Sequence, residues 1–215
     1  MITTRILKTA LAGAVAVLAA CSDSTGNDNP GPGSLSFSYS GARAGGYSAN
    51  GEFVGRDTTF TKQPFAVGAR SRQAGQGMLG LLSYQPVTAS AGTMVVMAMP
   101  EVSGSGSFDF ADESCLDEDF TACPLGFVVF DTNPDLLEDE NSQFFIFSSG
   151  TVNIQSTSGG RLRGTFSGTA ETLFADSTIT ITNGTFDVPV RSESSLGLNR
   201  AAARARLMQS RHARP

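Results

Sequence analysis

Apolar and polar residues alternate along much of this chain. In LSFSYSG, Leu35, Phe37 and Tyr39 fall on one face and serines on the other, which is the period of two that indicates a half-buried strand. Similar short runs recur at close spacing, separated by Gly, Asn and Pro. Together they predict about eleven strands, at residues 35–41, 46–54, 64–70, 78–85, 93–99, 125–131, 143–149, 151–157, 161–171, 177–182 and 185–190.

Many short strands joined by tight turns predict an all-β fold, either an antiparallel β-sandwich or a barrel-like sandwich. The composition agrees, since the 215 residues include 24 glycines and many serines and threonines. The length of the chain suits one such domain. We therefore expect a single β domain over residues 35–192, followed by a short C-terminal helix or tail over residues 193–215.

The parity of the apolar residues changes across Gly184. A two-residue Asn183-Gly184 turn would pair Ile181 with Phe186 and keep the apolar side chains of both strands on one face. A continuous strand with a glycine bulge would also account for the change. We favour the hairpin.

The first twenty residues have the layout of a secretory signal. Arg5 and Lys8 lie in a short basic region, an apolar stretch follows, and small residues precede Cys21. A bilayer-spanning helix needs about 20 apolar residues, and this stretch has roughly ten. We interpret residues 1–20 as a signal peptide and not as a transmembrane helix.

The sequence Leu18-Ala19-Ala20-Cys21 resembles the lipobox of bacterial lipoproteins. The resemblance implies that a diacylglyceryl group is attached to the cysteine sulfur, that the signal is removed before Cys21, and that the new N-terminus is acylated. Two or more acyl chains hold a protein stably on a membrane. In this family Ser22, in place of aspartate, favours the outer over the inner membrane. The alternative is an ordinary signal with a cysteine near its cleavage site by chance.

The segment after the lipobox, SDSTGNDNPGPGS, has no apolar residue able to join a core. A flexible coil of this length has a root-mean-square reach of about 20 Å. We therefore expect residues 21–34 to tether the lipid to the β domain.

The C-terminal part, residues 150–190, resembles the ending of uncharacterised envelope lipoproteins that carry a domain of unknown function. Those chains share a G-T-F-x-x-x-A strand and an I-T-N-G-x-F-x-V close, and both motifs occur here. Gly168 stands where those chains more often have an aromatic or other apolar residue. Because the motifs consist of strand and turn residues, the resemblance implies a β fold and no activity.

Charge is distributed unevenly. Acidic residues concentrate in residues 109–140, whereas five arginines lie in residues 200–215, and the net charge is −5. An acidic body repels phosphate backbones, so nucleic acid is not an expected partner. The Arg-rich segment from Asn199 is either a frayed basic tail or a segment that docks on anionic lipid headgroups or on the protein's own acidic region.

Cys115 and Cys123 enclose a loop short enough to be closed by a disulfide in an oxidising compartment. The loop-entropy argument gives such a bridge about 2 to 3 kcal/mol of stabilisation. The rival interpretation, a zinc site, needs four Cys or His ligands, and the single histidine, His212, lies in the tail. Lipidation of Cys21 would leave these two cysteines as an even pair, and we predict that they form a disulfide.

The acidic residues raise a calcium hypothesis, because carboxylate and carbonyl oxygens on a flexible loop suit this hard cation. Asp131, Asn133 and Asp135 match the beginning of a D-x-N-x-D calcium loop, and Asp117 and Asp119 begin a second one. Both loops lack the glycine and the final bidentate glutamate of that pattern. The alternative is a solvated loop in which Asn133 caps a short helical turn.

No group of residues has the spacing of a catalytic set. A Ser/His/acid arrangement needs a well-held histidine, and no pair of carboxylates stands out as in a glycosidase. Met94, Met97 and Met99 could suit copper, but on a strand Met97 and Met99 share one face and Met94 lies on the other, as expected for core packing.

The sequence therefore predicts a lipid-anchored, non-enzymatic protein of the bacterial cell envelope that acts as a structural, binding or accessory module. Its expected partners are the membrane, through the N-terminal lipid, and an envelope protein of unknown identity. No cofactor is expected except the Ca²⁺ of the calcium hypothesis. The first alternative is a calcium-dependent binding module that uses the acidic loops, and the second is a carboxylate-based hydrolase.

Overall fold

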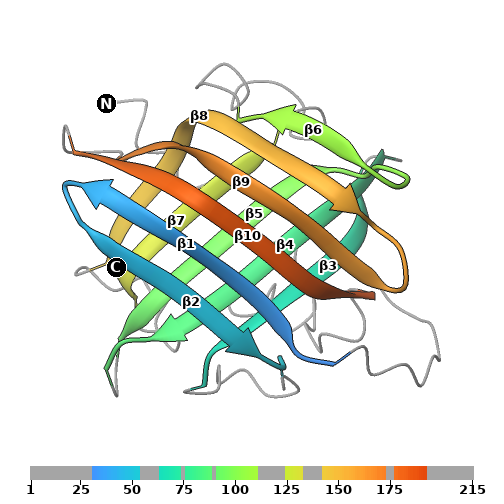
Figure 1. Ribbon diagram of the computed structural model, residues 1–215, viewed down its shortest axis with the longest axis horizontal. Coiled ribbons are helices and arrows are strands. Elements are labelled where there is room, and N and C mark those ends of the chain that lie inside the picture. The colour runs from blue at the N-terminus through green and yellow to red at the C-terminus, as the bar shows by residue number, and fades with distance from the viewer. Residues whose placement is uncertain are drawn as a thin grey trace, which may run out of the picture.

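The computed structural model describes residues 31–53, 63–73, 76–88, 91–110, 124–132, 142–172 and 177–192 (Figure 1). These residues form β-strands and no helix, and so none that is long and apolar enough to cross a membrane. The strands are β1 (Gly33–Gly41), β2 (Gly45–Gly51), β3 (Phe65–Gln73), β4 (Gln76–Pro86), β5 (Gly92–Pro100), β6 (Gly106–Asp109), β7 (Leu125–Thr132), β8 (Gln143–Ser156), β9 (Arg161–Thr172) and β10 (Thr178–Ser192).

Seven of the ten described strands close into a barrel. Their order is β10, β3, β4, β5, β7, β8 and β9. The pairing of β9 with β10 closes the ring. Strands β1 and β2 extend the sheet from β10, and β6 pairs with β8. The predicted all-β, barrel-like fold is confirmed. The pairing is antiparallel except between β10 and β3, which run parallel.

The two longest strands, β8 and β10, connect two layers. Along one edge β10 pairs first with β1, up to Asp187, and then with β3 from Val190 onwards. In the same way β8 pairs with β7 up to Ile146 and with β6 from Thr151 onwards. Figure 1 shows a front layer of β1, β2, β10, β9 and β6 that crosses a back layer of β3, β4, β5 and β7.

Strand β8 joins two of the predicted strands because Gly150 lets the chain bend without ending the pairing. Its φ is +122°, and a Cβ there would lie 2.2 Å from the carbonyl oxygen of Ser167. The residue paired with it on β9 is Gly168, whose own Cβ would lie 2.2 Å from the carbonyl oxygen of Ser149. A larger residue at position 168 would therefore collide with the backbone of β8.

The predicted hairpin at Asn183-Gly184 is wrong, and the bulge is the observed structure. Strand β10 runs through these residues, with Asn183 in the left-handed region at a φ of 55°. Its register against β9 shifts between Ile181, opposite Gly168, and Gly184, opposite Phe166. Both halves of β10 pair with β1 and β9, so neither half is free to pair with the other. The apolar residues on both sides of the bulge still face the interior.

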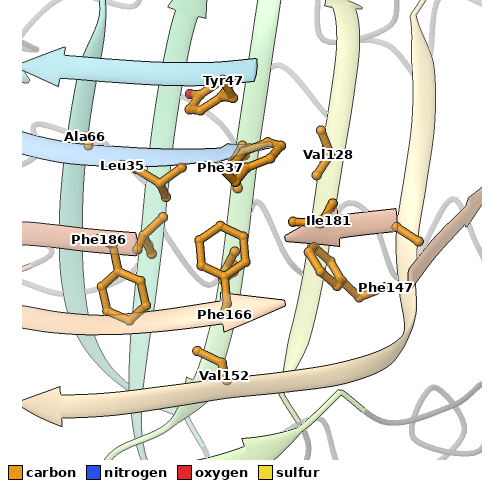
Figure 2. Packing of buried hydrophobic residues seen from close by; sticks show 14 of the residues in the cluster. Leu35, Phe37, Tyr47, Ala66, Val128, Phe147, Val152, Phe166, Ile181 and Phe186 are labelled. Carbon is orange, nitrogen blue, oxygen red and sulfur yellow. The ribbon is translucent and has the colours of Figure 1, made fainter. Parts of the chain in front are cut away.

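The barrel interior is filled by apolar side chains from both layers (Figure 2). Phe37 stacks on Tyr47 with ring centroids 4.9 Å apart and meets Phe166 edge-on at 5.7 Å. At another place Phe110 stacks on Phe147 at 4.2 Å. Burial of each large apolar side chain contributes about 1.5 to 3 kcal/mol, so this core is the main source of stability.

The two layers differ on their outer faces. The back layer has a second buried apolar cluster there, which includes Phe65, Met94 and Val129. Strands buried on both faces have nearly continuous apolar sequences, which explains TMVVMAM in β5; Met97 and Met99 do face the interior, on the side opposite Met94. The outer face of the front layer is polar instead. Its exposed hydroxyl residues include Ser34, Ser38, Ser40, Ser167, Thr180, Thr182 and Thr185.

Candidate functional site

Of the candidate site residues predicted from the sequence, Asp131 is the one that lies among the described residues. The predicted lipidation site, the two cysteines of the predicted disulfide and the other four candidate calcium ligands lie outside them. These residues are Cys21, Cys115, Cys123, Asp117, Asp119, Asn133 and Asp135.

Asp131 is the second-last residue of β7 and has an unusual backbone conformation, with a φ of 56°. Its carboxylate forms an ion pair with Arg43, which comes from the connection between β1 and β2. The same guanidinium donates a hydrogen bond of 2.8 Å to Gln143 Oε1 and lies 4.9 Å from the ring centroid of Phe130. The first carboxylate of the proposed calcium loop therefore already has a cation from this chain as its partner.

The two acidic segments are connected in the chain to opposite ends of β7. Residues 111–123 lie between Phe110 and the start of β7, and residues 133–141 lie between the end of β7 and the start of β8. An eight-residue strand is about 26 Å long. No group of three or more Asp, Glu, His or Cys side chains is placed to hold a metal ion in the described part of the chain.

The described part of the chain is electrically balanced. It contains six arginines and six acidic residues. Each of these carboxylates bonds to an arginine or a hydroxyl group, so its charge serves a contact within the barrel. The pairs are Glu52 with Arg191, Glu101 with Arg70, Asp109 with Thr151, Asp131 with Arg43, Glu171 with Ser148, and Asp187 with Arg161 and Arg163.

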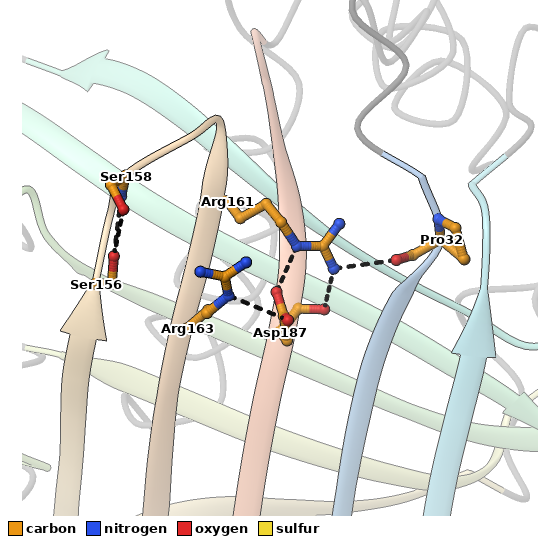
Figure 3. Close-up of polar contacts among 6 residues, drawn as sticks. All are labelled: Pro32, Ser156, Ser158, Arg161, Arg163 and Asp187. Carbon is orange, nitrogen blue, oxygen red and sulfur yellow. Dashed lines mark hydrogen bonds and ion pairs between the residues drawn. The ribbon is translucent and has the colours of Figure 1, made fainter.

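The largest of these polar clusters joins β9, β10 and the residue that precedes β1 (Figure 3). Arg161 contacts Asp187 twice, through Nε to the carboxylate at 2.5 Å and through a terminal nitrogen to the backbone oxygen at 3.0 Å. The same nitrogen donates to the carbonyl oxygen of Pro32 at 3.1 Å. Arg163 Nε lies 3.1 Å from the other carboxylate oxygen of Asp187.

Two opposing influences act on the pKa of Asp187. Partial burial raises it, but the hydrogen bonds and positive charges of Arg161 and Arg163 outweigh burial and hold it below its ordinary value. The carboxylate therefore stays ionised at neutral pH and bridges the two guanidinium groups. Arg163 and Asp187 are directly opposite each other in the β9–β10 register. Their contact can therefore be predicted from the sequence once the register of these two strands is known.

The chain enters and leaves the described barrel at the same place. Next to Pro32, a Cβ on Gly33 would lie 2.9 Å from Pro189 Cδ, so the start of β1 lies against β10. One residue later on β10, Val190 donates a backbone hydrogen bond of 2.8 Å to Gly160, the neighbour of Arg161. We call this group of residues the exit corner; it consists of Pro32, Gly33, Gly160, Arg161, Pro189 and Val190.

A buried polar chain crosses the interior. The hydroxyls of Tyr47 and Ser83 are 2.8 Å apart, and Ser83 donates to the carbonyl oxygen of Phe65 at 3.0 Å. Because Ser83 has a single hydroxyl hydrogen, Tyr47 is the donor to Ser83. Burial raises the pKa of Tyr47 far above its ordinary value, so it is neutral and serves the packing of β2 against β3 and β4.

Comparisons of the chain with models of protein families, with curated proteins and with solved structures found no match.

Proposed function

We propose that this chain is a lipid-anchored, non-enzymatic β-barrel module of the bacterial cell envelope, held on the membrane through Cys21 and sorted to the outer membrane. The observation that carries the proposal is the place of the lipobox-like sequence relative to the fold. Strand β1 begins at Gly33, so a short polar segment joins Cys21 to the barrel.

The geometry of the exit corner supports the role of this segment as a tether. Arg161 holds the carbonyl group of Pro32, and Gly33 packs against Ala66 and Pro189, so the chain is fixed to the barrel where the tether ends. A flexible coil of eleven residues, the number from Cys21 to Gly31, would have a root-mean-square reach of about 17 to 20 Å. A lipid on Cys21 would therefore keep the exit corner close to the membrane surface.

The polar groups of the barrel support a binding or structural role. The described carboxylates each bond to an arginine or hydroxyl group, and the buried hydroxyls of Tyr47 and Ser83 bond to each other. These contacts serve the fold. The exposed hydroxyl face of the front layer offers an envelope partner a polar surface. We include this chain among the envelope lipoproteins that its residues 150–190 resemble.

The proposal is tested by fractionating cells that express the wild type, Cys21→Ala and the matched control Ser22→Ala. The wild type and Ser22→Ala should be found in the membrane fraction as a processed, acylated protein. Cys21→Ala should be released from the membrane or accumulate as an uncut precursor, because the acceptor sulfur is gone. Identical fractionation and gel mobility of Cys21→Ala and the wild type would disprove the anchor.

A further inference from the structure

We propose that the outer edge of β2 is an interface at which two copies of this chain pair, strand against strand, around a twofold axis at Ser48. The occupant of the edge is β2 of a second copy, which runs antiparallel to the first. Such a dimer does not require the lipid anchor, so it can be tested separately from the proposed function.

The outer edge of β2 carries backbone groups that no described strand uses. Strand β2 is the outermost strand of the front layer and pairs with β1 alone among the described strands (Figure 1). The backbone amide of Ser48 donates a hydrogen bond of 3.1 Å to the side-chain oxygen of Gln85, so it points away from β1. Because backbone groups alternate in direction along a strand, those of Gly46 and Asn50 also point to this edge. All three edge residues are exposed.

The edge lacks the features with which proteins usually prevent strand-to-strand pairing, namely prolines, charged side chains and bulges. From Gly45 to Gly51, β2 has neither proline nor charged residue, and its register against β1 continues without a shift. The other end of the described sheet differs, because β6 is four residues long and ends at Asp109. An open row of copies joined β2 to β6 would need both edges, so this difference favours a closed pair of β2 strands.

Strand β2 is held in place from the interior. Tyr47 donates to Ser83 and stacks on Phe37 (Figure 2). At the end of the strand, a Cβ on Gly51 would lie 2.1 Å from the carbonyl oxygen of Pro64, so the backbone of β2 packs directly on the residue before β3. A partner strand would therefore meet an edge that is already ordered, which lowers the entropy cost of binding.

Antiparallel self-pairing fits the residues at the edge. With the axis at Ser48, this residue faces Ser48 of the second copy, and Gly46 of each copy faces Asn50 of the other. The backbone groups of all three residues then bond across the junction. The side chains that face each other are small and uncharged, so no like charges are opposed. Gln85 gives up its hydrogen bond with Ser48 when the partner strand binds.

The first test measures association of the purified full chain by sedimentation equilibrium in a density-matched detergent. The edge of β2, about 23 Å long and about 10 Å deep, is small for an interface, so concentrations of about 1 to 300 µM are used. We expect a monomer–dimer equilibrium. Ser48→Lys places two positive charges side by side at the axis and should weaken association at least about tenfold, whereas the matched variant Ser48→Thr should retain it.

The second test uses Gln85→Ala, because this side chain occupies the amide that the partner strand needs. Its removal frees the N–H group of Ser48, so we expect association to become about two- to tenfold tighter, which corresponds to one recovered hydrogen bond. Unchanged or weaker association of Gln85→Ala would show that this amide takes no part in the interface, and it would overturn the proposal.

The register is tested with single cysteine variants and the short thiol cross-linker bis-maleimidoethane. Ser48→Cys should form covalent dimers, because the two Cα atoms at the axis are about 5.5 Å apart. Asn50→Cys lies on the same edge, but its two copies are about 14 Å apart in this register, so it should give no more dimer than the wild type treated in the same way. A monomer at every concentration, or equal cross-linking of the two variants, would overturn the proposal.

Discussion

The buried pair formed by Tyr47 and Ser83 gives a sharp prediction about stability. Replacing Ser83 with Ala removes the acceptor of the Tyr47 hydroxyl, and no solvent reaches this place because the exposed fractions are 2% for Tyr47 and 0% for Ser83. The variant keeps the tyrosine hydroxyl as a buried donor without a partner. Such a group costs more than the hydrogen bond itself contributes.

The expected magnitudes follow from which groups are left without a partner. An unpaired buried hydroxyl costs about 1 to 3 kcal/mol, so we expect Ser83→Ala to lower the free energy of unfolding by about 2 to 3 kcal/mol. Tyr47→Phe should cost about 1 kcal/mol, because Ser83 still donates to the carbonyl oxygen of Phe65. The double variant leaves no unpaired hydroxyl and should cost about 1 to 2 kcal/mol, less than Ser83→Ala alone.

The assay is urea unfolding followed by far-UV circular dichroism, with all variants compared at one protein concentration. The matched control is Ser36→Ala, which deletes a hydroxyl of an exposed pair, 3.0 Å from Thr185 Oγ1, and should cost less than about 0.5 kcal/mol. If the two single changes add up in the double variant, the hydroxyls are not coupled and the reasoning is refuted.

Three further predictions concern other parts of the fold. Gly150→Ala, with a Cβ 2.2 Å from a backbone oxygen, should cost about 3 kcal/mol or more, whereas Gly159→Ala, at a φ of +63° with open space around it, should cost about 1 kcal/mol in thermal unfolding. Because the folded-state pKa of Asp187 is lowered, its stabilising contribution is present above about pH 4 and is lost as the pH falls through the folded-state pKa. Asp187→Asn should therefore lower the free energy of unfolding at neutral pH, and the variant should lose less stability than the wild type when the pH is lowered. Millimolar Ca²⁺ should leave the melting temperature unchanged, because Arg43 already neutralises Asp131, and a clear rise would instead favour the calcium-loop hypothesis.

Much of the strand pattern can be predicted from local alternation, because the front layer has one buried and one exposed face. Leu35 and Phe37 point inwards and the intervening serines point outwards, as the sequence predicts. The continuity of β8 and β10 could not be predicted in this way. Gly150 and Asn183 look like turn residues, but here their positive φ angles accommodate a bend and a bulge, because strands distant in the sequence pair on both sides.

Two other features depend on contacts that local patterns do not contain. Strand β6 is four residues long, too short to stand out from its neighbours, and it forms because β8 offers a free edge after its bend. The parallel pairing of β10 with β3 joins residues more than one hundred positions apart. The exit corner has the same origin, since Arg161 meets Pro32 only once the barrel has closed.

The most direct test of the proposed lipid anchor is mass spectrometry of the N-terminal peptide of the processed protein, isolated from the membrane fraction. We expect a peptide that begins at Cys21 and carries a diacylglyceryl group on the sulfur and an acyl group on the new N-terminus. A mature chain that begins elsewhere, or that carries an unmodified Cys21, would contradict it.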